Sequence, residues 1–267
     1  MISIIDSTGH ERFLGNIPGK LKMRWTVYGD VPQTPMVPQS RWEEFCNPAL
    51  EDDPFLPPTH DQDGVGECNC SATAGGMERN RNQEGLPYVH LSAADLYGRI
   101  NGGSDNGSML EDGLQVSMAE GVCTVDACGY LDWRKGANPS QQQLQERKKY
   151  RVLEAFLCPT FAHCMSAVIE GFSLISGILW YPNYDPDGDG WLPTYGSGSP
   201  GGHAVMGYAP AKRGNQYGIW HQNSWGARWG RKGRCVFPES AYGNSIGGWW
   251  AIRSTVTEDG DIPAPRS

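Results

Sequence analysis

The sequence predicts an α+β fold in which a helical first half is followed by an antiparallel second half. Helix-starting signals concentrate in one half of the chain, whereas short apolar runs between glycine-rich turns concentrate in the other. The chain contains 35 glycines and 19 prolines, well above the ~12% that these residues contribute on average, so many turns and long loops are expected. A length of 267 residues suits one medium-sized domain or two lobes that share a cleft.

Residues 1–36 are interpreted as an N-terminal extension that precedes a main domain at 37–267. The extension carries two strand-like runs, 2–5 and 21–28, which are separated by glycine and proline. Apolar residues alternate along the second run, which predicts a strand with one buried face. We expect this run to lie against the sheet of the second half as a permanent part of the fold.

The stretch from about 60 to 150 is predicted to form a mainly helical lobe. A helix is expected to begin near Cys68, where small residues that allow close packing follow a glycine-containing loop. A second helix is expected to begin at Ser92, because Asp95 stands three residues later as a variant of the capping box. A third helix is expected at 109–120, where a glycine then ends it.

The stretch from about 151 to 253 is predicted to form a barrel-like antiparallel lobe. It contains one helical pattern at 161–169. Five strand-like runs with glycine-rich turns between them complete the lobe, at 172–181, 203–208, 217–222, 233–238 and 249–252.

Composition and charge exclude several classes of partner. The formal net charge is −8, and no basic stripe gathers the 22 lysines and arginines, which argues against nucleic acid. No segment reaches the ~18 consecutive apolar residues of a membrane span. The residues after Met1 lack the basic and apolar regions of a secretory signal, which favours the cytoplasm. The eight cysteines are therefore expected to be mostly free thiols.

Cysteine catalysis needs a thiolate, a base, a group that orients the base, and donors for an oxyanion. Cys68 stands at a predicted helix start, where unpaired N–H groups can lower a thiol pKa from ~8.5 towards ~3.5–7.5. Gln62 lies six residues earlier and can donate a hydrogen bond beside the Cys68 N–H. His203 follows two glycines and opens an apolar strand, which leaves room for a ligand. Asn223 can hold His203 in the useful tautomer, and Trp225 would shield their hydrogen bond from water.

This order of Gln, Cys, His and Asn resembles that of the papain family of cysteine peptidases. His203 and Asn223 follow Cys68 at separations close to the ~130–150 residues known for that family. The segments GGHAVMGY and WHQNSWGARWGRKGRCVF are similar to the family's His and Asn segments. The resemblance covers about 37–253 and implies two lobes, with the catalytic Cys and His on opposite walls of a cleft. It also implies that the backbone near Gly107 pairs with an extended substrate.

Three positions depart from the family pattern. Asn69 replaces the aromatic residue that usually follows the nucleophile, which leaves a polar group to satisfy. Val65 replaces a cysteine, so one customary disulfide is missing. Glu67 would oppose thiolate formation if it pointed into the site, and we expect it to face solvent.

Other interpretations of the candidate nucleophile stay open. Cys68 alone is compatible with a buried structural thiol, although that does not explain Gln62, His203 and Asn223 in order. Cys70 is the rival nucleophile, but it lies eight residues after Gln62 and points to another side of the helix.

The remaining histidines lack a motif. A metal site formed by His60 with the two neighbouring cysteines of the helix start is a weaker alternative. His60 and His221 are interpreted as ordinary loop and strand side chains, and His90 and His163 have no catalytic setting.

A run of acidic residues resembles the opening of a calcium-binding loop. Asp185, Asp187, Asp189 and Gly190 have the spacing of an EF-hand-type loop. The closing glutamate is absent, because Gly196 stands at its position. We therefore favour a turn that joins two strands, with no metal and no cofactor expected.

Together these features predict a monomeric cysteine endopeptidase that acts on polypeptides and binds neither nucleic acid nor membrane. Cys68 would attack a peptide carbonyl, Gln62 and the Cys68 N–H would stabilise the oxyanion, and His203 would protonate the leaving amine. Asn223 would orient His203 throughout. Two alternatives remain: a catalytically silent binding module on the same fold, and another acyl transfer, such as hydrolysis of a peptidoglycan crosslink or transpeptidation.

The N-terminal extension needs a role of its own. Residues 1–36 are too short for the usual inhibitory helical propeptide of the papain family. Besides the permanent position against the sheet, the alternative is a removable plug that lies in the cleft over Cys68.

Overall fold

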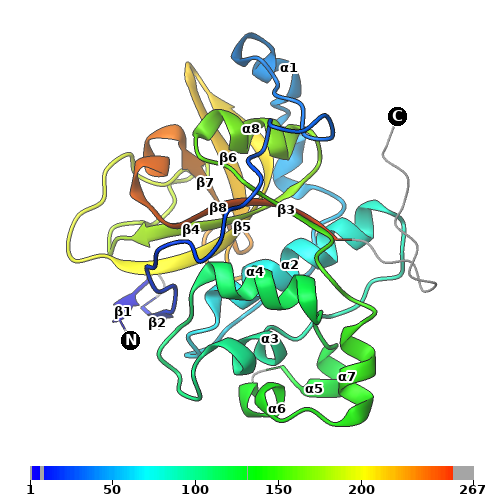
Figure 1. Cartoon of the computed structure of the whole chain (residues 1–267). Coiled ribbons are helices and arrows are strands. Elements are labelled where there is room, and N and C mark those ends of the chain that lie inside the picture. The colour runs from blue at the N-terminus through cyan, green and yellow to red at the C-terminus, as the bar shows by residue number, and fades with distance from the viewer. Residues whose placement is uncertain (1, 7–8, 131, 255–267) are drawn as a thin grey trace.

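The computed structural model describes residues 2–6, 9–130 and 132–254. Figure 1 shows α2 to α7 gathered on one side of a curved sheet and α8 on its other side. The helices are α1 (Trp42–Phe45), α2 (Cys68–Gln83), α3 (Ala93–Ile100), α4 (Leu110–Ala119), α5 (Val125–Cys128), α6 (Trp133–Ala137), α7 (Gln141–Arg147) and α8 (Phe161–Ile169). Short 3-10 turns are η1 (Gln39–Arg41), η2 (Pro48–Asp52) and η3 (Glu239–Asn244).

The strands form one hairpin and one large antiparallel sheet. They are β1 (Ile2–Ile5), β2 (Glu11–Leu14), β3 (Glu154–Leu157), β4 (Ser173–Trp180), β5 (Gly201–Arg213), β6 (Gln216–Gln222), β7 (Arg234–Pro238) and β8 (Ser245–Arg253). The hairpin pairs β1 with β2, and the six-stranded sheet has the order β3-β8-β4-β5-β6-β7. Within the described strands the two edges β3 and β7 do not pair, so the sheet is barrel-like and open.

The predicted helices begin where their local signals stand. α2 starts at Cys68, and Ser92 caps α3 by accepting a hydrogen bond from the Asp95 N–H at 3.1 Å. α2 packs closely on the sheet, because a Cβ added to Gly76 would lie only 3.0 Å from the side chain of Ile252. The glycine costs helix propensity and gives the close contact that fixes α2 beneath β4 and β8.

Two buried clusters cover the two faces of the sheet. One joins α8 with β4, β5 and β8 through apolar side chains such as Phe161, Met165 and Leu174. The other joins α2, α3 and α4 with the opposite face through side chains such as Met77 and Met206. None of the helices in the described ranges is long and apolar enough to cross a bilayer.

The N-terminal extension differs from its prediction in part. The run 2–5 is a strand, as expected, but 21–28 forms no strand beyond one bridge between Val27 and Leu157 of β3. Leu21 and Met23 are 44% and 52% exposed, so the alternating apolar residues do not form one buried face. The segments β2, β3 and α5 to α7 were not predicted at all.

Candidate active site

Cys68 opens α2 and is fully buried. Burial raises the pKa of its thiol to about 11, although backbone hydrogen bonds with Gly15, Ala204 and Asn69 act in the opposite direction. The expectation that the helix start lowers the pKa of the Cys68 thiol is therefore wrong for the described structure. The hydrogen bond with Ala204 also brings the Cys68 sulfur beside the backbone of β5, one residue from His203.

His203 stands on β5 and lies opposite Ile178 of β4 in the sheet register. Its Nε2 lies 2.8 Å from Oδ1 of Asn223, which also accepts a hydrogen bond from the Ser224 N–H at 2.7 Å. Because an amide oxygen only accepts hydrogen bonds, Nε2 carries the proton and Nδ1 keeps its lone pair. Nδ1 is buried and has no hydrogen-bond partner among the described residues, so it remains available to take a proton.

Two tryptophans enclose this imidazole. Trp225 stacks on His203 with ring centroids 4.7 Å apart, and Trp180 meets it edge-on at 5.1 Å. Burial lowers the pKa of His203 to about 4, although the hydrogen bond with Asn223 raises it. The imidazole is therefore neutral near pH 7, and the Trp225 ring lies against its face.

Gln62 is held from both sides of the cleft. Its Oε1 accepts a hydrogen bond from the Ser224 hydroxyl at 2.6 Å, and its Nε2 donates to the carbonyl of Val65 at 2.7 Å. The same Nε2 donates to the carbonyl of Phe13 at 3.1 Å. The Phe13 carbonyl of the N-terminal extension therefore accepts a hydrogen bond from the same amide that is predicted to donate to a substrate oxygen.

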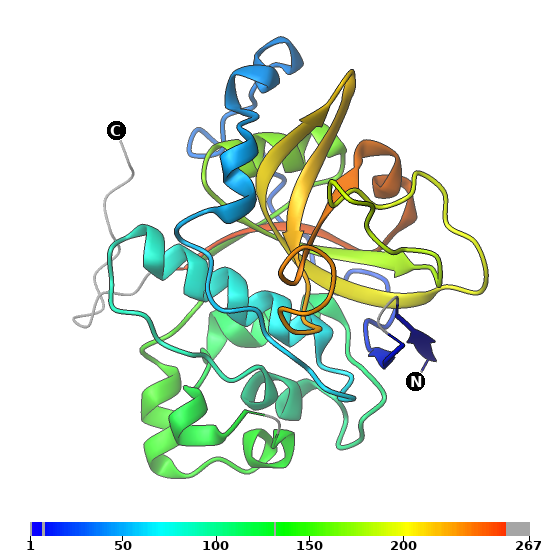
Figure 2. The ribbon, with the colours of Figure 1, turned by 180° about the vertical axis from the view of Figure 1, so that it is seen from behind.

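The N-terminal extension passes between the two lobes beside Cys68. The Ser108 N–H donates to the Gly15 carbonyl at 2.8 Å, the Ile17 N–H to the Ser108 carbonyl at 3.0 Å, and the Asn16 N–H to the Gly202 carbonyl at 2.9 Å. Figure 2 shows the hairpin of β1 and β2 beside one end of β5. We call residues 13–17 the cleft segment.

The cleft segment contacts the backbone that the sequence assigned to substrate. A Cβ added to Gly107, which has a φ of 88°, would lie 2.2 Å from the Gly15 carbonyl oxygen. The absence of a side chain at Gly107 therefore permits another chain to approach this closely. In this structure the approaching chain is the protein's own N-terminal extension.

Glu67 and Asn69, two of the residues that depart from the family pattern, are buried inside the protein. Glu67 is only 1% exposed, so the expectation that it faces solvent is wrong. Burial, followed by the charge of Asp105, raises the pKa of Glu67 well above its usual range, which favours the uncharged form beside Cys68. Asn69 donates to the Ser108 hydroxyl at 2.7 Å and accepts from the Cys70 thiol at 2.8 Å.

Cys70 lacks the surroundings of a nucleophile. Burial, and next the charge of Glu67, raise the pKa of its thiol well above the usual range. Its thiol is already bonded to Asn69. All eight cysteines are free thiols, in agreement with the missing cysteine at position 65.

The acidic run has the geometry of a turn. Asp187 accepts hydrogen bonds from the backbone N–H groups of Asp189 and Trp191 at 3.0 and 2.9 Å, and it pairs with Arg213 at 2.5 Å. The three carboxylates of Asp185, Asp187 and Asp189 do not form a ligand group within the described part of the chain. A cation at this position would compete with Arg213, so we retain the turn interpretation.

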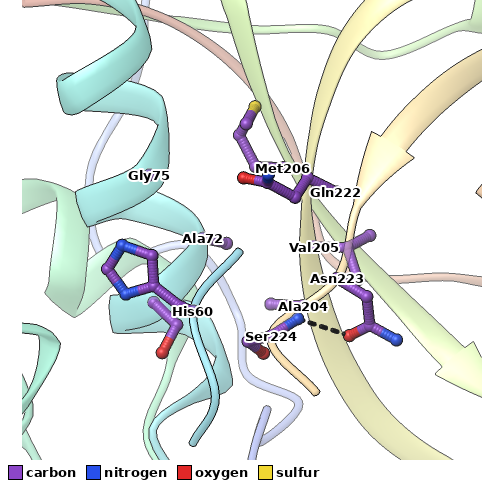
Figure 3. Close-up of a pocket in the computed structure, with 10 residues that line it drawn as sticks. His60, Ala72, Gly75, Ala204, Val205, Met206, Gln222, Asn223 and Ser224 are labelled. Carbon is purple, nitrogen blue, oxygen red and sulfur yellow. Dashed lines mark hydrogen bonds between the residues drawn. The ribbon is translucent and has the colours of Figure 1, made fainter. Parts of the chain in front are cut away.

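A cavity of about 10 Å³, the size of about one water molecule, lies between α2 and the sheet. Figure 3 shows His60 and Ala72 on the α2 side of this cavity and Asn223 on the sheet side. A peptide is too large for this space. This cavity is therefore not the substrate site that the sequence analysis expects.

One cluster was missed by the sequence analysis. His60, Glu78 and His90 place one ligand atom each within 4.8 Å of one another. The three residues come from a loop, from α2 and from a second loop, and their spacing matches no metal-binding motif. Only the fold brings them together.

Comparison with solved structures identifies the fold. The chain is similar to xylellain, a cysteine protease from Xylella fastidiosa, with a TM-score of 0.73, 21% identity, and coverage of 96% of this chain and 99% of that chain. It is similar to procathepsin B S9 from Trypanosoma congolense, with a TM-score of 0.68, 16% identity, and coverage of 91% and 85%. It is also similar to bromelain from Ananas comosus in complex with the E64 inhibitor, with a TM-score of 0.60, 18% identity, and coverage of 78% and 97%.

The similarity is structural. No family model and no curated protein matches the sequence. The mixed helices and antiparallel sheet nevertheless form a papain-like fold, as the sequence predicts.

Proposed function

We propose that this chain is a papain-type cysteine peptidase with Cys68 as nucleophile, His203 as base, Asn223 as the orienting residue and Gln62 as an oxyanion donor. The observation that carries the proposal is the hydrogen bond from His203 Nε2 to Asn223 Oδ1 at 2.8 Å. It leaves the lone pair of Nδ1 free on an imidazole whose neighbouring backbone contacts the Cys68 thiol. His221, which is also fully buried on a strand, instead has both ring nitrogens in hydrogen bonds, with Ser176 and Ile219.

The chemistry follows from the protonation states of the two residues. Neutral His203 takes the thiol proton from Cys68, and the thiolate attacks the peptide carbonyl. The Cys68 N–H and Gln62 Nε2 stabilise the oxyanion. His203 then gives its proton to the leaving amine, and a water molecule, deprotonated by His203, hydrolyses the thioester and restores the thiol.

The cleft segment makes the described state a closed one. Residues 13–17 occupy both backbone-pairing positions, at Ser108 and at Gly202, and cover the thiol. We propose that substrate enters only when this segment leaves the cleft. The contacts of Val27 and Trp25 with the sheet lobe would keep the rest of the extension attached. Residues 1–36 would then contain both a permanent part of the fold and a removable plug over Cys68.

A catalytically silent module is the second candidate, because a covered thiol with a raised pKa is also what such a module would have. Peptide-library hydrolysis separates the two. We expect cleavage by the unmodified protein, none by Cys68→Ala, and near-full cleavage by Cys70→Ser. Full activity of Cys68→Ala refutes the mechanism. If E64, the inhibitor held by bromelain, fails to label Cys68 even when Gly15→Val displaces the cleft segment, the silent module is supported.

A further inference from the structure

We propose that His60, Glu78 and His90 form a binding site for a divalent transition metal of the zinc type. The ligand atoms of the three residues lie within 4.8 Å of one another. His60 Nε2 and Glu78 Oε2 are 3.1 Å apart, which is near the ~3.3 Å that separates two ligands of a tetrahedral zinc with bonds of ~2.0 Å. Two imidazoles and one carboxylate are a ligand set that zinc accepts with one position left for water.

The carboxylate is oriented for this task by its other oxygen. Glu78 Oε1 accepts the Leu91 N–H at 2.7 Å, while Oε2 faces His60. Such outer hydrogen bonds orient a metal ligand and fix its position. Glu78 can therefore offer one oxygen to a metal without losing its bond to the backbone.

The buried carboxylate of Glu78 is a second reason to expect a cation at this site. Glu78 is 1% exposed, and a buried carboxylate needs a positive partner. Among the ion pairs of the described residues, its partner is His60. His90 places its ring nitrogen within reach of the same point as His60 and Glu78. A metal ion held by these three residues would place positive charge beside the buried carboxylate.

The position of the site allows entry and excludes most of the solvent. His90 is half-buried, while His60 and Glu78 are buried. The Tyr130 ring lies 5.3 Å from His90 and 6.2 Å from His60, which gives the cluster an aromatic wall. A small cation can reach the site through the side on which His90 lies.

The site is linked to the proposed oxyanion loop through the backbone. The His60 carbonyl accepts the Gly226 N–H at 2.9 Å, and the Gln62 N–H donates to the Ser224 carbonyl at 2.9 Å. A metal that ties His60 to α2 would therefore stabilise the loop that carries Gln62. This proposal does not rest on peptidase activity, because it concerns binding and stability.

The test uses the full chain with Cys68→Ala, so that the cleft thiol cannot bind the metal. Zinc chloride is titrated into the metal-free protein, and calorimetry and thermal unfolding report binding and stability. We expect one zinc per chain and a rise in Tm. His90→Gln should weaken binding by more than the ~10–100-fold that loss of an outer-shell partner costs. His163→Gln, which alters a half-buried histidine elsewhere, should bind as tightly as the parent.

A second variant and a second metal guard against misfolding and against other ligands. Glu78→Gln keeps an acceptor for Leu91 and should also lose zinc, and circular dichroism of the metal-free variants checks their fold. Co²⁺ should give the visible bands of a nitrogen and oxygen site without thiolate charge transfer. Unchanged zinc affinity in His90→Gln, or no binding by the parent, would overturn the proposal and leave His60 and Glu78 as a simple ion pair.

Discussion

The two walls of the proposed cleft differ in the state of their candidate catalytic residues. On the sheet wall, His203 is bonded to Asn223, stacked under Trp225 and neutral. On the helical wall, the thiol of Cys68 is covered by Gly15 and its pKa is raised to about 11. In the proposed mechanism the base is thus already neutral in the described state, whereas the nucleophile is a buried thiol with a raised pKa. The difference lies in what covers each wall, because both lie on rigid secondary structure.

The sheet wall can be weakened by removing the orienting residue. Asn223→Ala should lower turnover by part of the ~10²–10⁴-fold that a positioned base contributes, since Asn223 transfers no proton. The measurement is kcat and KM on a cleaved peptide, with Asn106→Ala, an exposed asparagine, as control. An unchanged kcat would mean that the Trp225 stack alone holds the imidazole.

The helical wall can be weakened at Gln62. Gln62→Ala removes a side-chain oxyanion donor and should cost on the order of 10²–10³ in kcat with little change in KM. The exposed Gln145→Ala on α7 is the matched control. A change confined to KM would show that Gln62 binds the ground state and does not stabilise the transition state.

Much of the candidate site could be predicted from sequence, because its parts carry local signals. A helix start at Cys68, a glycine pair before His203 and the NSWG segment at Asn223 each carry a short-range signal. The strands β4 to β8 could be predicted for the same reason. Their apolar runs and glycine-rich turns lie within a few residues of one another.

The features that could not be predicted depend on distant contacts. The cleft segment is held by backbone hydrogen bonds to Ser108 and Gly202, which need no periodic pattern. Glu67 is buried, although its sequence position suggested solvent. The cluster around Glu78 joins three segments that no spacing rule connects.

The free energy of unfolding should depend differently on pH in the unmodified protein and in the variant His203→Gln. The pKa of His203 is lowered to about 4 from 6.5, so its neutral form stabilises the fold above about pH 6.5 and this contribution is lost as pH falls towards 4. The free energy of unfolding should fall relative to His203→Gln by up to ~1.4 kcal/mol per pH unit in this range. Urea titrations of both proteins at several pH values measure this difference. The opposite contribution of Glu67 is present in both proteins and therefore cancels. Parallel curves would contradict neutral burial of His203.

The most direct test of the covered nucleophile is the alkylation rate of Cys68 when the cleft segment is forced out. A Cβ added to Gly15 would lie 2.0 Å from the Gly66 carbonyl oxygen, so Gly15→Val cannot keep the segment in place. Gly243→Val is the control, because no atom lies within 4 Å of its added Cβ. Asn16→Pro removes the bond to Gly202 and provides an independent displacement.

Iodoacetamide labelling at pH 6, followed by peptide mass spectrometry, reads the rate for each cysteine. The account predicts that Gly15→Val and Asn16→Pro raise labelling of Cys68 by ~10-fold or more, because each pKa unit lost is tenfold more thiolate. Gly243→Val and the rate at Cys70 should not change. Equal Cys68 labelling in all four proteins, or faster labelling of Cys70, would contradict the assignment of Cys68 as a nucleophile covered by the protein's own N-terminal segment.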